Sequence, residues 1–175
     1  MRTQPQATPA HVVHPIEPLF DNESHVLILG SMPSPTSRDA GFYYAHPQNR
    51  FWRVLARLFE EEHPASRAER AAFALRHGIA LWDVLASCDI AGASDASIRN
   101  PEPNDLGLIL DRAPITCVFT TGGTASHLYQ RFDAPLWPEL PHIALPSTSA
   151  ANARASLDDL VAAYVPVLEV LRERL

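Results

Sequence analysis

The sequence predicts a three-layer α/β/α domain built on a central, four-stranded parallel sheet. Short apolar runs alternate with amphipathic helical segments along the chain, and this alternation is typical of parallel α/β folds. The apolar runs are continuous, as in strands that are buried on both faces. Since no repeat or linker interrupts the pattern, we expect one domain over residues 21–175, preceded by an extended arm over residues 1–20.

Four apolar runs are the predicted strands. They cover residues 25–30 (HVLILG), 79–85 (IALWDVL), 115–120 (ITCVFT) and 142–145 (HIAL). Ligands of open parallel sheets bind at the carboxyl ends of the strands. The loops that follow these runs are therefore the candidate site.

The predicted helices lie between the strands. The first covers residues 49–61, where apolar residues recur at helical spacing from Phe51 to Phe59. The others are expected at 66–77, 105–113 and 124–131, and from a capping box at 156–159 toward Leu175, with a bend near Pro166. Residues 31–46 and 87–104 are rich in Pro, Gly and Ser and are predicted to be loops.

Composition excludes several kinds of chemistry. All 14 basic residues are arginine, so no lysine can form a Schiff base. The two cysteines, Cys88 and Cys117, form no CxxC pair and cannot hold a four-cysteine iron–sulfur cluster. The eight histidines show no HExxH spacing. We therefore expect no metal and no cofactor.

The net charge of −6 argues against broad electrostatic binding of nucleic acid, although a local basic patch is compatible with it. No apolar run approaches the roughly 20 residues that span a bilayer, and the N-terminus lacks the pattern of a signal peptide. We expect a cytoplasmic monomer with no membrane partner.

Each predicted strand end carries a distinctive polar sequence. These are Gly30-Ser-Met-Pro-Ser34, Trp82-Asp83, Thr121-Gly-Gly123 and Pro146-Ser-Thr-Ser149. Together they predict a cleft lined by backbone amides, hydroxyls and one carboxylate. They match neither a GxSxG elbow nor the GxGxxG and P-loop patterns.

Three motifs follow one another along the chain: Gly30-Ser-Met-Pro-Ser34 at a strand end, the longer stretch Gly41–Trp52 (GFYYAHPQNRFW), and Leu145–Ser149 (LPSTS) at another strand end. Within a match from Val26 to Ala155, they resemble the uracil-DNA glycosylase superfamily, and in particular its hypoxanthine-DNA (deoxyinosine) glycosylase branch, related to the mismatch-specific uracil glycosylases. The resemblance implies an enzyme that removes a deaminated base from double-stranded or single-stranded DNA.

The first motif departs from most of the superfamily. Many members carry Asn or Asp where this chain has Met32, and a thioether cannot orient or deprotonate water. The hypoxanthine branch implies that Asn49 takes over this catalytic role. Position alone favours Asn49 as the N-cap of the following helix, and the two roles are compatible.

The base-binding candidates come from the strand ends and the long motif. Tyr44 is expected to stack on the flipped base, unless it is a core aromatic residue. Asp83 is expected to accept the N1–H of hypoxanthine, unless it only caps nearby backbone amides. The backbone at Gly30, Ser31 and Met32 is expected to stabilise charge on the leaving base.

The DNA-binding candidates are an arginine face and the last strand-end loop. Arg50, Arg53 and Arg57 share one helix face, which is either solvated or in contact with phosphates. The resemblance places the residue that enters the duplex as a wedge near Ala151. The small hydroxyls and amides around this position suit contacts with phosphate oxygens. This group consists of Ser147, Thr148, Ser149, Asn152 and Arg154.

The resemblance implies a glycosylase that flips hypoxanthine out of DNA and hydrolyses its N-glycosidic bond in base excision repair, and the absence of lysine predicts a monofunctional enzyme without strand cleavage. Three alternatives remain at this point. The substrate is uracil or xanthine instead of hypoxanthine; the protein is a non-catalytic nucleic-acid or nucleotide-binding module; or it is an unrelated small-molecule hydrolase.

Overall fold

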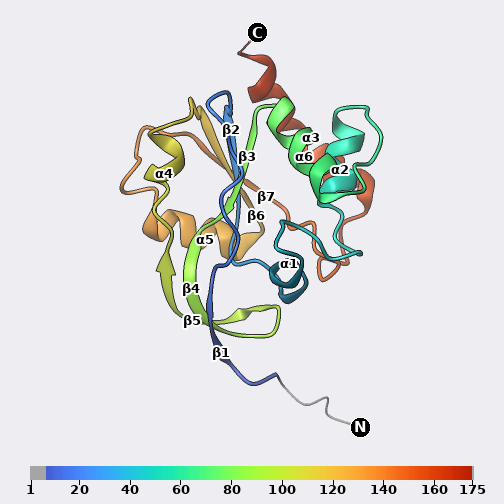
Figure 1. The fold of residues 1–175 in the computed structure, drawn as a ribbon. Helices are drawn as coiled ribbons and strands as arrows, with labels where there is room; N and C mark the ends of the chain where they lie inside the picture. Colours follow the sequence, from blue (N-terminus) through green and yellow to red (C-terminus); the bar gives the residue numbers. More distant parts are fainter. Residues whose placement is uncertain (1–6, 175) are drawn as a thin grey trace.

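The structure is a computed structural model that describes residues 7–174. Its centre is a four-stranded parallel sheet in the order β3-β2-β6-β7 (Figure 1). The strands are β2 (Val26–Gly30), β3 (Ile79–Asp83), β6 (Cys117–Thr121) and β7 (His142–Leu145). The predicted sheet is confirmed, with strand bounds that differ by one or two residues from those expected.

The strand register brings the carboxyl ends of the strands together. Gly30 pairs with Asp83 across β2 and β3, and Thr121 pairs with Leu145 across β6 and β7. Because all four strands run the same way, the loops that follow them meet at one edge, the lower end of the sheet in Figure 1. This is the edge that the sequence predicts to hold the site.

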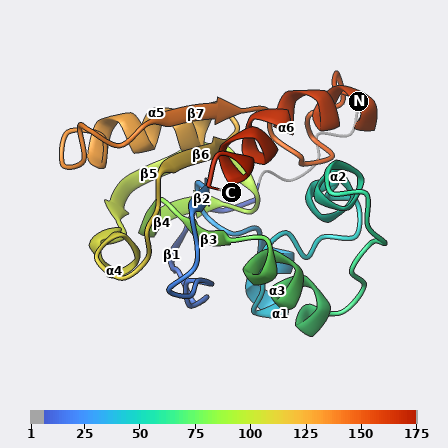
Figure 2. The same ribbon diagram turned by 90° about the horizontal axis from the view of Figure 1, so that it is seen from above.

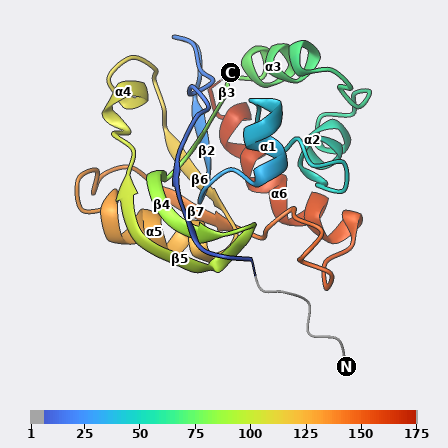
Figure 3. The same ribbon diagram turned by 60° about the horizontal axis from the view of Figure 1, so that its bottom comes forward.

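One face of the sheet is covered by α2 (Phe51–Leu58), α3 (Arg67–Arg76) and α6 (Leu157–Arg172) (Figures 1 and 3). The apolar stripe of α2 is buried, as its spacing predicts. The predicted capping box of α6 is present, and α6 continues through Pro166.

The opposite face is covered by α4 (Gly107–Leu110) and α5 (Gly123–Phe132), so the two groups of helices lie on opposite sides in Figures 2 and 3. The helix predicted over 105–113 is confined to one turn. No helix of residues 7–174 is long and apolar enough to cross a membrane.

A second, antiparallel sheet was not predicted. It has the order β1-β4-β5, from β1 (Ala10–Val13), β4 (Leu85–Ala91) and β5 (Ser94–Pro103). The loop prediction for residues 87–104 is therefore wrong: they form most of a hairpin that turns at Gly92, which has a φ of 59°. Prolines are tolerated in β5 because it is an edge strand.

The second sheet also changes the picture of the predicted arm. β1 pairs with β4, and Leu19 forms an isolated bridge with Leu81 of β3. Residues 10–20 therefore pack onto the domain instead of extending from it. Residues 1–6 lie outside the described part of the chain.

The loop predicted over residues 31–46 contains a short helix, α1 (Pro35–Ala40). The hydroxyl of Ser34 caps its first turn, Pro35 occupies a position where no N–H is needed, and Gly41 ends it with a φ of 66°. This helix lies at the lower end of the sheet, beside the strand-end loops (Figure 1).

Candidate functional site

A cavity of about 440 Å³ lies at the carboxyl edge of the parallel sheet. We call it the base cavity. Most of the predicted site residues line it, namely Gly30, Ser31, Met32, Tyr44, Asn49, Asp83, Ser147 and Ser149. The fold therefore brings together all three sequence motifs and the end of β3. Within residues 7–174, no group of three or more side chains is arranged to hold a metal ion.

Asp83 lies in the wall of this cavity and is held by a histidine that the sequence did not single out. Its Oδ2 lies 2.7 Å from Nε2 of His14, and the side chains are only 7% and 3% exposed. Nδ1 of His14 accepts the backbone N–H of Ile16 at 3.2 Å. Because Nδ1 is an acceptor, Nε2 carries the proton and donates it to Asp83. The carboxylate is thus fixed in place by a neutral imidazole.

Gly30 is required by the position of that carboxylate. A Cβ atom at residue 30 would lie 2.4 Å from Oδ1 of Asp83 and 3.6 Å from the hydroxyl of Tyr44. A side chain here would collide with the carboxylate. Gly30 therefore allows Asp83 to pack directly against the end of β2.

Tyr44 is held rigidly at the side of the base cavity. Its ring stacks on Phe51 with centroids 3.8 Å apart, and its hydroxyl lies 3.2 Å from Oγ1 of Thr121. Its backbone has a φ of 51°, which is uncommon for a bulky residue. Burial, and secondarily the charge of Asp83, raises the pKa of Tyr44, so the phenol is neutral at physiological pH.

Asn49 orders the start of α2, and this restricts its chemistry. Its Oδ1 accepts the backbone N–H of Phe51 and the hydroxyl of Thr148, both at 2.9 Å. These two bonds use both lone pairs of the carbonyl oxygen. A carbonyl that orients the attacking water, as the sequence suggested, is therefore not available in this arrangement. Nδ2 has no acceptor within residues 7–174, so the amide donors of Asn49 remain free.

Arg50 holds the loop that follows β7 through backbone carbonyls. Its guanidinium donates to the carbonyls of Ser149 at 3.0 Å, Asn152 at 2.9 Å and Thr148 at 3.4 Å, and also to that of Ala155. These bonds fix the loop that follows β7. These bonds use four of the five N–H donors of Arg50, so its predicted DNA contact stays a prediction that rests on the remaining donor.

The rest of the arginine face is partly occupied. Arg57 forms an ion pair with Asp158 at 2.8 Å, and one N–H of Arg53 donates to the carbonyl of Pro47 at 2.9 Å. Both side chains are surface groups. Apart from these two contacts, the guanidinium groups of Arg53 and Arg57 make no hydrogen bond within residues 7–174.

The loop from 147 to 154 is ordered by its own side chains. Nδ2 of Asn152 donates to the carbonyl of Ser147 at 3.0 Å, and Oγ of Ser147 accepts the N–H of Ser149 at 3.2 Å. Thr148 is buried against Asn49. Arg154 is exposed, and its side chain makes no hydrogen bond or ion pair within residues 7–174.

Asp95 is a second site residue that the sequence did not reveal. It comes from β5, and its Oδ2 accepts the hydroxyl of Ser31 at 2.9 Å. Residue 95 is exposed overall, but its carboxyl borders the cavity, where partial desolvation, and secondarily the charge of Asp83, raises the pKa of the Asp95 carboxyl above its usual range. The turn signal at Gly92 could have indicated the hairpin that carries it. The β-branched pair Val12-Val13 was the corresponding signal for the strand that leads to His14.

Comparison with known proteins identifies the family of this chain. The family model of the uracil DNA glycosylase superfamily matches residues 17–171. Two curated proteins named hypoxanthine DNA glycosylase, from Methanosarcina barkeri and Methanosarcina acetivorans, are 32% and 31% identical over 139 residues. Each alignment covers 79% of this chain and 87% of the relative.

The solved structures show the same fold. A solution NMR structure from Methanosarcina acetivorans, of a protein described as a candidate uracil DNA glycosylase, superposes with a TM-score of 0.73 at 26% identity. The match covers 87% of this chain and 96% of that protein. The chain is therefore a DNA glycosylase that belongs to the uracil-DNA glycosylase superfamily.

Proposed function

We propose that this DNA glycosylase excises hypoxanthine from deoxyinosine in DNA as a step of base excision repair. The observation that carries the proposal is the Asp83 carboxylate, buried in the base cavity and fixed by His14. Hypoxanthine presents an N1–H donor that such a carboxylate accepts. The names of the two Methanosarcina relatives support the same substrate.

The target nucleotide must leave the duplex to reach Asp83. Extrusion costs a few kcal/mol and is least costly for a base that pairs badly. The Tyr44 ring, supported from one side by Phe51, gives the extruded purine a rigid stacking surface.

The leaving base gains negative charge as its bond to C1′ breaks. The backbone N–H groups of Ser31 and Met32 have no acceptor within residues 7–174. They are free to donate to the base, and donors fixed in advance stabilise developing charge most effectively.

Water activation needs a group other than Met32 or the Asn49 carbonyl. Asp95 is the second carboxylate that lines the base cavity, and its raised pKa suits a general base. In the proposed step, Asp95 accepts a proton from water while the water oxygen bonds to C1′. The glycosidic bond breaks, hypoxanthine leaves with the bonding electron pair, and the proton returns from Asp95 to the free base. The Nδ2 donors of Asn49 position the water oxygen.

The product is an abasic site with an intact backbone. Strand cleavage by a lyase needs an amine nucleophile, and the chain contains no lysine. The 147–154 loop and Arg53 supply the contacts to the phosphate backbone beside the cavity.

A panel of substrates tests this function. The protein in excess is incubated with duplexes that contain one deoxyinosine, deoxyuridine or deoxyxanthosine, and alkali then reveals abasic sites. We expect cleavage after alkali, fastest with deoxyinosine, and no cleavage before alkali. Faster excision of uracil or xanthine would overturn the assigned substrate. No abasic site in any duplex would support a binding module instead of an enzyme.

A further inference from the structure

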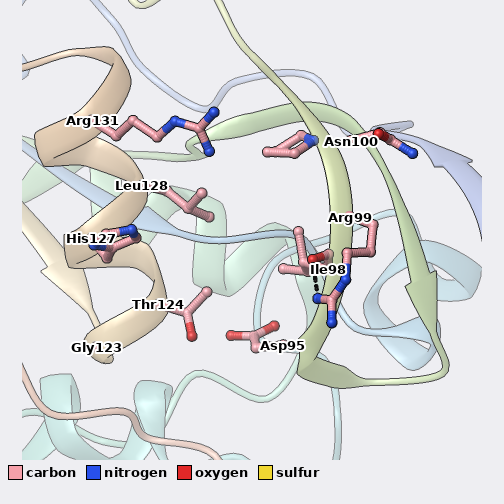
Figure 4. A pocket seen from close by; sticks show the side chains of 10 residues that line it. Asp95, Ile98, Arg99, Asn100, Gly123, Thr124, His127, Leu128 and Arg131 are labelled. Atoms are coloured by element: carbon pink, nitrogen blue, oxygen red, sulfur yellow. Dashed lines mark hydrogen bonds between the residues drawn. The ribbon is translucent and has the colours of Figure 1, made fainter.

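A second cavity, of about 470 Å³, lies between the β5 strand and the α5 helix (Figure 4). We call it the β5–α5 groove. Arg99 and Asn100 come from its β5 wall, and His127 and Arg131 come from α5. Asp95 lines both this groove and the base cavity, so the two cavities adjoin at Asp95.

The groove carries positive charge that is not neutralised. Neither Arg99 nor Arg131 forms an ion pair with a carboxylate within residues 7–174. Arg99 donates from one nitrogen to the carbonyls of Ala96 and Ile98, and the Arg131 guanidinium lies 4.6 Å from the centre of the Phe132 ring. Figure 4 shows Arg131 extending from α5 toward the β5 wall. Both guanidinium groups therefore retain free N–H donors.

Two carboxylates lie near these arginines, and both accept hydrogen bonds from other residues. Asp95 accepts the Ser31 hydroxyl on the side of the base cavity. Asp89 lies opposite Arg99 in the β4–β5 strand register, and its carboxylate accepts hydrogen bonds from His11 and from Nδ2 of Asn100. In the lining of the groove, the two guanidinium groups of Arg99 and Arg131 outnumber the single carboxylate of Asp95, on a chain whose net charge is −6.

We propose that the β5–α5 groove binds phosphates of the DNA strand that carries the extruded nucleotide. The inference rests on the proposed function. With the base in the base cavity, the sugar lies near its mouth, and the adjoining backbone must leave across the rim. Asp95 occupies the rim shared with the groove, so a strand passing it meets Arg99 and Arg131. Guanidinium groups match phosphate oxygens in both charge and geometry.

Salt-dependent binding tests the inference. The probe is a duplex with one tetrahydrofuran abasic analogue, which cannot be hydrolysed, and the dissociation constant is measured by fluorescence anisotropy between 50 and 300 mM salt. The test variant is R99Q/R131Q. The matched control is R112Q/R172Q, which removes the same charge from two exposed arginines away from both cavities.

Each phosphate contact contributes a slope of about 0.9 in log K against log salt, or roughly eightfold in affinity at 0.1 M relative to 1 M salt. We expect R99Q/R131Q to lower the slope by about 2 and to weaken binding at 0.1 M salt by up to about 60-fold. In the control, both the slope and the affinity at 0.1 M salt should stay close to their wild-type values.

The proposed function is measured separately, as the single-turnover excision of hypoxanthine at saturating protein. The control R112Q/R172Q should excise at the wild-type rate. A wild-type slope in R99Q/R131Q, or an equal loss in the control, would overturn the groove proposal while leaving the glycosylase activity intact. Wild-type protein that binds with the expected slope but releases no base would instead overturn the proposed function.

Discussion

Gly30→Ala is the sharpest structural test of the base cavity. The added Cβ would lie 2.4 Å from Oδ1 of Asp83, whereas ordinary contacts begin near 3.4 Å. Gly30 does not have a positive φ, so the backbone accepts alanine without strain. The substitution therefore acts on Asp83 and not on the fold.

The expected magnitude follows from this distance. The carboxylate must move by about 1 Å to restore normal contact. A shift of that size disrupts the 2.7 Å hydrogen bond from His14, and a hydrogen bond to a charged group contributes about 1.5–3 kcal/mol. If that energy orients the base-reading carboxylate, kcat/KM falls by roughly 10- to 100-fold.

The assay is the excision of hypoxanthine from a deoxyinosine duplex under single-turnover conditions, with thermal unfolding measured in parallel. Gly123→Ala is the matched control, because a Cβ at that residue meets no atom within 4 Å. Wild-type excision by Gly30→Ala, at unchanged stability, would refute the assignment of Asp83 as the base-reading group.

Three further predictions concern other carboxyl and amide groups. Asp133 is buried, its Oδ2 has no hydrogen-bond partner among the described residues, and burial raises its pKa from 3.8 to about 7. Since the folded protein holds this proton more tightly than the unfolded chain, stability is greatest below pH 4 for this group and decreases by about 4 kcal/mol as the pH rises through 7. Urea unfolding from pH 5 to pH 8 should show a smaller decrease for Asp133→Asn, and an unchanged pH dependence would contradict the shift. Asp95→Asn should slow excision by about 100- to 10,000-fold. It should also remove the acid limb of the pH–rate profile, which in the wild type lies above the usual carboxyl range near 4 because the pKa of Asp95 is raised. A variant with the wild-type profile would exclude Asp95 as the base. Asn49→Asp keeps the oxygen that accepts from Phe51 and Thr148 but loses the amide donors, so we expect slower excision with little change in stability. Asn49→Ala should in addition lose about 1–2 kcal/mol of stability in a denaturant titration. Full activity of Asn49→Asp would remove the amide from the mechanism.

The parallel sheet was predictable because burial on both faces leaves a clear sequence signal. β2 is buried at every position and reads as a continuous apolar run. β5 gives no such signal, since most of its residues are exposed and it contains two prolines that an edge strand tolerates. β1 is similarly exposed, and only its pairing with β4 makes it a strand.

The site was predictable where a side chain sits next to a strand or helix end. Gly30 and Asp83 end their strands, and Asn49 lies two residues before α2. His14 and Asp95 act through hydrogen-bond partners 69 and 64 residues away in the chain, so the signals at Val12-Val13 and Gly92 could indicate their strands but not these contacts. The role of Arg50 depends equally on distant partners, the carbonyls of a loop about 100 residues later in the chain.

The central claim is that Asp83 reads hypoxanthine in the base cavity. The most direct measurement is the amount of free hypoxanthine released from a deoxyinosine duplex, determined by mass spectrometry for the wild type and for Asp83→Ala in one time course. We predict that the wild type releases hypoxanthine in step with the appearance of abasic sites. Asp83→Ala should release it at least about 100-fold more slowly, because the N1–H of the buried base would lose the carboxylate that His14 holds in place. No free hypoxanthine from the wild type, or equal release by both proteins, would contradict the claim.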